Sequence, residues 1–223
     1  MSTEPSRNPP TESVLLRGAE GNIDVLIDAP ADVRGIALVC HPHPLFSGSN
    51  TNKVAHTLAR AYRDLGYAAL RPNFRGVGKS EGAHDHGDGE TEDMLAVIAW
   101  AQSRWGSLPL ALGGFSFGAF VQTRVVNRLA DGIAPPRQIV LVGTAAGVAS
   151  HGQRSYDTQA LPKGIPALLI HGETDDTVPL ANVLEWARPQ ELPVTVIPGA
   201  DHFFHAKLHI LRDIILRNVP ALG

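Results

Sequence analysis

The sequence predicts a three-layer α/β/α fold, in which helices cover both faces of a mostly parallel twisted sheet that carries an N-terminal antiparallel hairpin. Strand-like and helix-like patterns alternate from about residue 35 onward, and parallel strands need helical crossovers. Residues 35–40 form a continuous apolar run, which is typical of a strand buried on both faces. The length of 223 residues suits one domain of this kind.

The N-terminal part of the chain begins with two short strand-like patterns, residues 14–17 and 23–28. Turn glycines separate them, so they predict an antiparallel hairpin. After the buried strand at residues 35–40, residues 52–65 carry apolar side chains at helical spacing. Gly66 follows at the position where glycine commonly ends a helix.

The same alternation continues along the chain. Further strands are predicted at residues 67–70, 108–112, 138–142, 166–170 and 194–197, and further helices at residues 92–105, 117–129, 180–187 and 204–216. A polar, glycine-rich loop at residues 75–90 and a loop of about 20 residues after residue 142 interrupt the pattern. Because the chain holds no repeat or linker, we expect a single domain at residues 13–223 behind a flexible N-terminal tail, residues 1–12.

Composition excludes two classes of protein. Hydrophobic residues make up 43% of the chain and charged residues 18%, below the usual ~25%, which excludes a disordered chain. The formal net charge is −3, so the chain offers no basic field for a nucleic-acid backbone, and no nucleic-acid partner is expected.

The sequence predicts a cytoplasmic protein without membrane insertion. Its one cysteine, Cys40, cannot form an internal disulfide, and the first residues lack the apolar core of a signal peptide. Residues 105–123 lack charged side chains over the length of a membrane span, but they contain Pro109 and four glycines. We therefore expect a buried strand that turns into a helix there.

The pentapeptide GFSFG, residues 114–118, has the G-x-S-x-G pattern of a serine nucleophile elbow. Composition alone would produce such a pentapeptide with a probability of roughly one in ten, and GKSEG, residues 78–82, also matches. An elbow needs a strand directly before the serine and a helix directly after it. Ser116 has both, whereas Ser80 precedes a polar loop. The pattern therefore favours Ser116 as a nucleophile over an idle serine in a glycine-rich turn.

Two later segments supply partners for this serine, because a serine hydroxyl is a poor nucleophile without a base and an orienting acid. HGETDDTVP, residues 171–179, places two aspartates after a buried strand. GADHFF, residues 199–204, places a histidine just before the last predicted helix. The chain order is then serine, aspartate, histidine, as in the nucleophile-elbow hydrolases.

Together with HPHPLFSG, residues 41–48, and RPNFRGVGKSEG, residues 71–82, these segments resemble the small α/β-hydrolase-fold serine hydrolases. The chain is most similar to the predicted short-chain hydrolases related to dienelactone hydrolase and the carboxylesterases. The resemblance spans about residues 13–218 and implies the hydrolase fold. Dienelactone hydrolases use a cysteine at the nucleophile position, where this chain has Ser116. We expect neither a cofactor nor a metal ion.

Residue by residue, the resemblance implies Ser116 as the nucleophile, His202 as the general base and then the general acid, and Asp175 as the residue that orients the imidazole. The family pattern H-G-x-x-D-x-x-V-P matches Asp175, whereas Asp176 would cap the turn or helix that follows. Asp201 adjoins His202 in sequence and therefore points elsewhere, so we interpret it as a turn residue.

The reaction also needs backbone N–H donors for an oxyanion. Phe117, directly after the nucleophile, supplies one. In the loop after residue 40 two prolines lack an N–H, so the amide of His43 is the first usable donor, with Leu45 as the alternative. The resemblance agrees with His43, with Pro42 in place of the usual glycine. The imidazoles of His41 and His43 are candidates for supporting this loop.

Other motifs have competing explanations. The His and Asp residues at 84–88 lie too close together in a glycine-rich loop to surround one metal ion, so we expect a solvated loop there. A P-loop in this region would need glycine at the position of Asn73. Leu45, Phe46 and Phe203 lie near the site in sequence and are candidates for its substrate pocket, although core packing explains aromatic side chains equally well.

These observations predict a serine hydrolase that cleaves small carboxylic esters through an acyl-enzyme intermediate. Thioesterase and peptidase chemistry use the same residues, and a non-catalytic binding protein on the hydrolase scaffold is the alternative from another class. Only about 23 residues separate residues 142 and 166, where such hydrolases commonly insert a cap. We therefore expect no cap domain and an open site suited to short acyl groups.

Overall fold

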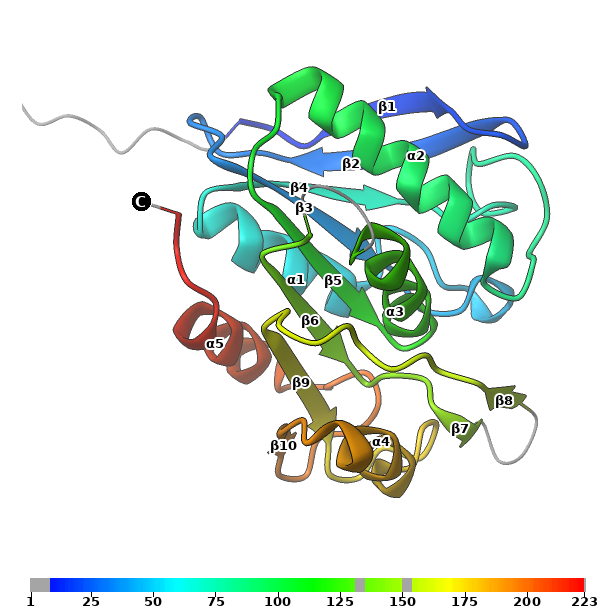
Figure 1. The fold of residues 1–223 in the computed structure, drawn as a ribbon, viewed down its shortest axis with the longest axis vertical. Coiled ribbons are helices and arrows are strands. Elements are labelled where there is room, and N and C mark those ends of the chain that lie inside the picture. The colour runs from blue at the N-terminus through cyan, green and yellow to red at the C-terminus, as the bar shows by residue number, and fades with distance from the viewer. Residues whose placement is uncertain (1–8, 131–134, 150–153, 223) are drawn as a thin grey trace, which may run out of the picture.

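The computed structural model describes residues 9–130, 135–149 and 154–222, built around one eight-stranded sheet (Figure 1). The order in the sheet is β1-β2-β4-β3-β5-β6-β9-β10. The strands are β1 (Glu12–Arg17), β2 (Asn22–Asp28), β3 (Gly35–Cys40), β4 (Tyr67–Pro72), β5 (Leu110–Phe115), β6 (Gln138–Val142), β9 (Ala167–Gly172) and β10 (Val194–Ile197). β2 pairs antiparallel with β1 and with β4, and every other pair in this sheet is parallel. The predicted parallel sheet with an N-terminal hairpin is confirmed.

Helices cover both faces of this sheet (Figure 1). They are α1 (Lys53–Asp64), α2 (Asp88–Trp105), α3 (Phe117–Ala130), α4 (Leu180–Ala187) and α5 (Leu208–Asn218), with the short 3₁₀ helices η1 (Pro44–Phe46) and η3 (Arg188–Gln190). One apolar core packs α2, α3 and α4 on the sheet through side chains such as Met94, Val125 and Val183. The other packs α1 and α5 through side chains such as Leu58 and Leu211. Since burying such a side chain stabilises a fold by ~1.5–3 kcal/mol, both layers hold the sheet in place.

The helix predicted at residues 92–105 begins earlier, at Asp88. The buried carboxylate of Glu90 accepts hydrogen bonds from the amides of Asp85 at 3.0 Å and Gly87 at 2.8 Å. A first turn whose amides are satisfied in this way can start inside a polar segment, because the acid also faces the positive end of the helix.

The last helix begins later than the predicted residues 204–216, at Leu208. Phe204 and Ala206 have φ values of 54° and 59°, in the left-handed region that does not continue an α-helix. The segment before α5 is therefore a tight loop, and this loop carries His202.

Three strands run further toward their carboxyl ends than the sequence predicts: β4 to Pro72, β5 to Phe115 and β9 to Gly172. The added residues are held by pairing with neighbours, as where Phe115 stands opposite Val142. Local preference does not reveal such pairing. As a result, the residues that directly follow these strands gather at one edge of the sheet.

The predicted loop between β6 and β9 contains a two-stranded antiparallel sheet, β7 (Gly147–Ala149) and β8 (Arg154–Tyr156). Asn182 on α4 donates to the carbonyls of Ala146 at 3.0 Å and Val148 at 2.6 Å, which fixes β7 beside α4. No cap domain is present among the described residues of this segment, as predicted.

Two further predictions concern the N-terminal tail and membrane insertion. Residues 1–8 of the predicted N-terminal tail lie outside the described residues, and β1 begins at Glu12. In the parts of the chain that the structure describes, no helix combines the length and apolarity needed to cross a membrane.

Candidate active site

Ser116 stands at a sharp turn between β5, which ends at the residue before it, and α3, which begins at the residue after it. Its φ is 56°, a strained conformation for a residue with a side chain. A Cβ on Gly118 would lie 2.4 Å from the carbonyl oxygen of Cys40 and 2.5 Å from that of His41, and one on Gly114 would lie 2.5 Å from the carbonyl oxygen of Gly118. The two elbow glycines are therefore required by backbone contacts.

Asp175 lies in the turn after β9, where its side chain is fixed by the backbone. Its Oδ1 accepts hydrogen bonds from the amides of Thr177 at 3.0 Å and Val178 at 2.7 Å. Its Oδ2 is thereby directed at His202, whose Nδ1 lies 2.7 Å away. A carboxylate held in this way cannot rotate without losing two hydrogen bonds.

His202 connects this carboxylate to the serine. Its Nδ1–H donates to Asp175, which leaves Nε2 free to accept the Ser116 hydroxyl at 3.0 Å. His202 is 3% exposed, and Asp175 and Ser116 are 7% exposed. The three predicted residues therefore come together in one hydrogen-bonded chain, shielded from solvent on the Asp175 side.

The other two aspartates near this chain make different contacts. Asp176 lies 3.4 Å from the hydroxyl of Thr177, on the exposed side of the turn. Asp201 accepts a hydrogen bond from the amide of His205 at 3.0 Å and pairs with its ring at 2.5 Å. Neither carboxylate contacts His202, so geometry favours Asp175 over Asp176.

His171 also contacts the acid, a relationship that the sequence analysis missed. Its Nε2–H donates to the carbonyl of Val178 at 2.9 Å and lies 3.3 Å from Oδ2 of Asp175. Burial lowers the pKa of His171, so the ring stays neutral in its pocket. This histidine opens the motif HGETDDTVP, and its position four residues before Asp175 was the available signal.

Two backbone amides in this region are candidates for binding an oxyanion. Among the described residues, the amides of His43 and Phe117 donate to no acceptor. The amide of Leu45, the alternative donor, is used by Nδ1 of His43 at 3.2 Å. Burial, followed by the charge of Arg154, lowers the pKa of His43 to about 3, so its ring is neutral and can accept this hydrogen bond.

His41 fixes the loop that carries the His43 amide. Its Nδ1–H donates to the carbonyl of Pro42 at 2.7 Å, and its Nε2 accepts the amide of Phe74 at 3.0 Å. Only the neutral ring can make both hydrogen bonds, and burial lowers the pKa of His41 to about 4. The predicted supporting role of an imidazole in this loop agrees with these contacts.

The buried His41 is expected to make stability depend on pH. Its pKa is lowered from 6.5 to about 4, so the unfolded chain binds the proton more readily than the folded one. Stability is then complete above about pH 6.5 and falls by roughly 3 kcal/mol as the pH drops toward about 4. Urea unfolding across this range should give a shallower pH slope for His41→Gln than for the native chain.

The matched control is His209→Gln, which changes an exposed histidine on α5 and should keep the native slope. Other buried histidines remain in both proteins, so the difference between the two slopes isolates His41. Equal slopes for His41→Gln and the native chain would contradict this assignment.

A cavity of about 360 Å³ opens at the Ser116 hydroxyl. Phe46 and Phe203, two of the predicted pocket residues, line it, whereas Leu45 lines an adjoining cavity of about 350 Å³. Arg154 and Tyr156 on β8 line both cavities, and the sequence analysis did not find them. The sequence feature that could have pointed to them is their position after β6, because the carboxyl ends of strands in such a sheet carry the site.

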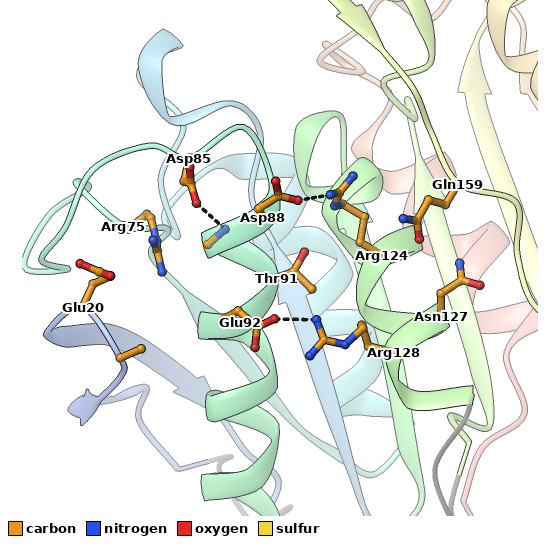
Figure 2. A pocket seen from close by; sticks show the side chains of 12 residues that line it. Glu20, Arg75, Asp85, Asp88, Thr91, Glu92, Arg124, Asn127, Arg128 and Gln159 are labelled. Carbon is orange, nitrogen blue, oxygen red and sulfur yellow. Dashed lines mark hydrogen bonds and ion pairs between the residues drawn. The ribbon is translucent and has the colours of Figure 1, made fainter.

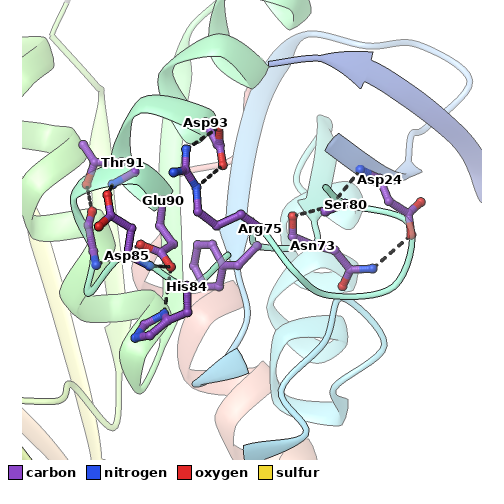
Figure 3. Close-up of polar contacts among 12 residues, drawn as sticks. Asp24, Asn73, Arg75, Ser80, His84, Asp85, Glu90, Thr91 and Asp93 are labelled. Atoms are coloured by element: carbon purple, nitrogen blue, oxygen red, sulfur yellow. Dashed lines mark hydrogen bonds and ion pairs between the residues drawn. The ribbon is translucent and has the colours of Figure 1, made fainter. Parts of the chain in front are cut away.

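The polar motifs before α2 have structural contacts (Figure 3). Ser80 of the second G-x-S-x-G donates to the carbonyl of Asn73 at 2.8 Å and accepts the amide of Asp24 at 2.9 Å, so it is a buried turn residue. Arg75 pairs with Asp93 at 2.9 Å. In the described ranges, no group of three or more His, Cys, Asp or Glu side chains could hold a metal ion.

Comparisons with known proteins find hydrolases among the similar chains. The pattern of the X-Pro dipeptidyl-peptidase (S15) family matches residues 22–135. The uncharacterized protein RP471 of Rickettsia prowazekii is 34% identical over 209 residues, which are 87% of this chain and 82% of that protein. The lysophosphatidylserine lipase ABHD12 of Danio rerio is 37% identical over 84 residues, which are 38% of this chain and 22% of the lipase.

A solved structure extends the similarity over nearly the whole chain. A Xanthomonas campestris protein, described as a member of the α/β serine hydrolases without a lid, is 35% identical with a TM-score of 0.82, covering 97% of this chain and 96% of that one. The chain therefore belongs to the α/β-hydrolase superfamily and, within it, to the serine hydrolases without a lid.

Proposed function

We propose that this protein is a serine esterase that cleaves small carboxylic esters through an acyl-enzyme intermediate. The observation that carries the proposal is the hydrogen-bonded chain from Asp175 through His202 to the Ser116 hydroxyl, with links of 2.7 and 3.0 Å. Two backbone amides that have no acceptor among the described residues also support it: Phe117 follows the serine, and His43 lines the same cavity.

In the first half of the reaction, Oγ of Ser116 forms a bond to the ester carbonyl carbon while Nε2 of His202 takes the hydroxyl proton. The amides of His43 and Phe117 bind the negative oxygen of the tetrahedral intermediate. The bond to the leaving alcohol then breaks, and His202 gives that oxygen its proton. Asp175 keeps the imidazole in the required tautomer and stabilises its positive form.

In the second half, water replaces the alcohol. His202 takes a proton from the water as its oxygen attacks the acyl carbon, the bond to Ser116 breaks, and Oγ recovers the proton. The products are the carboxylic acid and the free enzyme, so no cofactor is consumed.

Three observations favour an ester over a peptide substrate. Among the described residues that line the cavity at Ser116, none is acidic, so nothing there matches the ammonium group of a peptide N-terminus. The S15 pattern covers Ser116 but ends before Asp175 and His202. The lipase with a matching segment is by name an enzyme that acts on a lipid ester.

The cavity size favours a small acyl group. About 360 Å³ with no cap over it, and with Phe46 and Phe203 exposed at its rim, gives little surface to enclose a long chain. We propose a small-molecule ester as substrate and a cytoplasmic location for the reaction.

The test is a substrate series assayed at equal enzyme concentration. We expect kcat/KM for 4-nitrophenyl esters to be highest for acetyl to hexanoyl groups and to fall toward dodecanoyl. Acyl-CoA thioesters and X-Pro 4-nitroanilides should be cleaved more slowly. Activity that rises steadily toward dodecanoyl would contradict the small-substrate proposal, and faster cleavage of the X-Pro anilides would favour the peptidase.

A further inference from the structure

Two cavities of similar size meet beside the proposed nucleophile. One, about 360 Å³, contains the Ser116 hydroxyl, and the other, about 350 Å³, lies toward the loop before α2. His43, Arg154 and Tyr156 line both. A substrate whose carbonyl lies at Ser116 can therefore extend into the second cavity.

Among the described residues that line it, this double cavity holds an arginine but no carboxylate. The second cavity is lined by Arg154 and by the imidazoles of His43, His84 and His86. The His43 ring is neutral, so the formal positive charge of the cavity comes from Arg154. The whole chain has a formal charge of −3, so a cavity with an arginine and no carboxylate does not follow from its composition.

Arg154 differs from the other arginines near the α2–α3 face. In the separate polar cleft between α2 and α3, Arg124 pairs with Asp88 and Arg128 pairs with Glu92 (Figure 2). Arg154 forms no ion pair with a carboxylate in the part of the chain that the structure describes. A half-buried guanidinium without a carboxylate is suited to binding an anion from outside.

The ring of Phe46 holds this guanidinium in place. The central carbon of the Arg154 guanidinium lies 3.6 Å from the centre of the Phe46 ring. The guanidinium also forms a hydrogen bond with the hydroxyl of Tyr156, and its other N–H groups can donate to a ligand. The charge is thus positioned before any ligand arrives, which lowers the entropy cost of binding.

The opposite wall of the second cavity is also fixed. Nδ1 of His84 contacts the buried carboxylate of Glu90 at 2.8 Å (Figure 3). The His84 ring packs against those of His43 and His86, with centroids 4.7 and 4.9 Å apart. Glu90 is fully buried behind this wall and also accepts two backbone amides, so its oxygen atoms already have hydrogen-bond partners within the protein.

We propose that the second cavity is a subsite for an anionic group of the ester substrate, a carboxylate or a phosphate, and that Arg154 is the residue that selects for it. The inference rests on the proposed esterase function and specifies its substrate class. Both groups present oxygen atoms that can accept paired hydrogen bonds from one guanidinium edge. The subsite binds the substrate and takes no part in breaking the ester bond.

The experiment compares esters that differ in charge but not in the reacting bond. One arm uses mono-4-nitrophenyl adipate, which carries a carboxylate on the acyl side, against 4-nitrophenyl hexanoate. The other uses acetyl glycerol phosphate, which carries a phosphate on the alcohol side, against monoacetylglycerol. In at least one arm, the native chain should show a higher kcat/KM for the anionic ester, and added salt from about 20 to about 500 mM should reduce this preference.

Arg154→Met should lower the anionic-to-neutral ratio of kcat/KM by about 10- to 100-fold in the arm that shows the preference. Arg154→Lys should restore part of it, because the charge remains while the paired geometry is lost. The matched control, Arg128→Met, removes the same charge from the separate cleft and should leave the ratio at its native value. A ratio rather than a rate is compared, so a general loss of folded enzyme does not imitate the effect.

The outcomes separate the inference from the function on which it rests. If the native chain hydrolyses neutral esters through Ser116 but shows no anionic preference in either arm, or keeps its preference in Arg154→Met, the subsite is overturned and the esterase stands. If neither neutral nor anionic esters are hydrolysed, the proposed function itself fails.

Discussion

Replacing Ser116 with alanine is expected to lower kcat for 4-nitrophenyl acetate by about 10⁴-fold or more. The change removes one oxygen, the atom that attacks the ester, while the amide of residue 116 keeps its hydrogen bond of 2.9 Å to the carbonyl of Val142. The fold and the oxyanion amides therefore remain. Initial rates and covalent labelling by a fluorophosphonate probe measure the effect, and both signals should fall to background.

Ser80→Ala is the matched control, because Ser80 occupies the same place in the second G-x-S-x-G pentapeptide. Its loss removes two structural hydrogen bonds and should lower the melting temperature, while the folded fraction still takes up the probe at Ser116. Probe labelling that persists in Ser116→Ala and disappears in Ser80→Ala would reverse the assignment of the nucleophile.

Asp175→Asn is expected to reduce kcat by about 10⁴-fold with little change in stability. The amides of Thr177 and Val178 both donate to Oδ1, so the carbonyl oxygen of the new side chain must occupy that position. Its NH₂ group then replaces Oδ2, which lies 2.7 Å from Nδ1 of His202. A donor at this place forces the hydrogen of the imidazole onto Nε2, which can then no longer accept the proton of Ser116.

The neighbouring residue supplies the control for this change. Asp176→Asn alters an exposed carboxylate one position along the same turn and should retain native kcat. Steady-state rates at neutral pH, with circular dichroism to confirm folding, distinguish the two variants. A loss of kcat in Asp176→Asn together with an active Asp175→Asn would move the acid to Asp176.

The sequence predicted the sheet and the three central residues for the same physical reason. Parallel strands place their carboxyl ends at one edge, so motifs that directly follow β5, β9 and β10 must meet there. Each motif is local: a turn that needs glycine around Ser116, an acid turn around Asp175, and a loop around His202. Short-range pattern and strand polarity predicted that these motifs meet, and the family resemblance selected Asp175 over Asp176.

The walls of the cavity could not be predicted in this way. β7 and β8 are three residues each, and β7 is held by Asn182, which lies more than thirty residues further along the chain. Arg154 reaches the site only because of this long-range contact network. The late start of α5 likewise depends on the conformations of Phe204 and Ala206, which no side-chain periodicity reveals.

The close approach of Gly118 to the Cys40 and His41 carbonyls implies that different parts of the protein tolerate substitution to different degrees. The turn that carries the nucleophile and the proposed oxyanion loop contact each other through backbone atoms. Their spacing therefore depends on the backbone, and no side chain fits at that contact. Part of the cavity wall comes instead from η1 and the β7–β8 pair, which lie outside the eight-stranded sheet. Substitutions in those segments, natural or engineered, are therefore expected to change which substrate binds while the contact between the nucleophile turn and the oxyanion loop is kept.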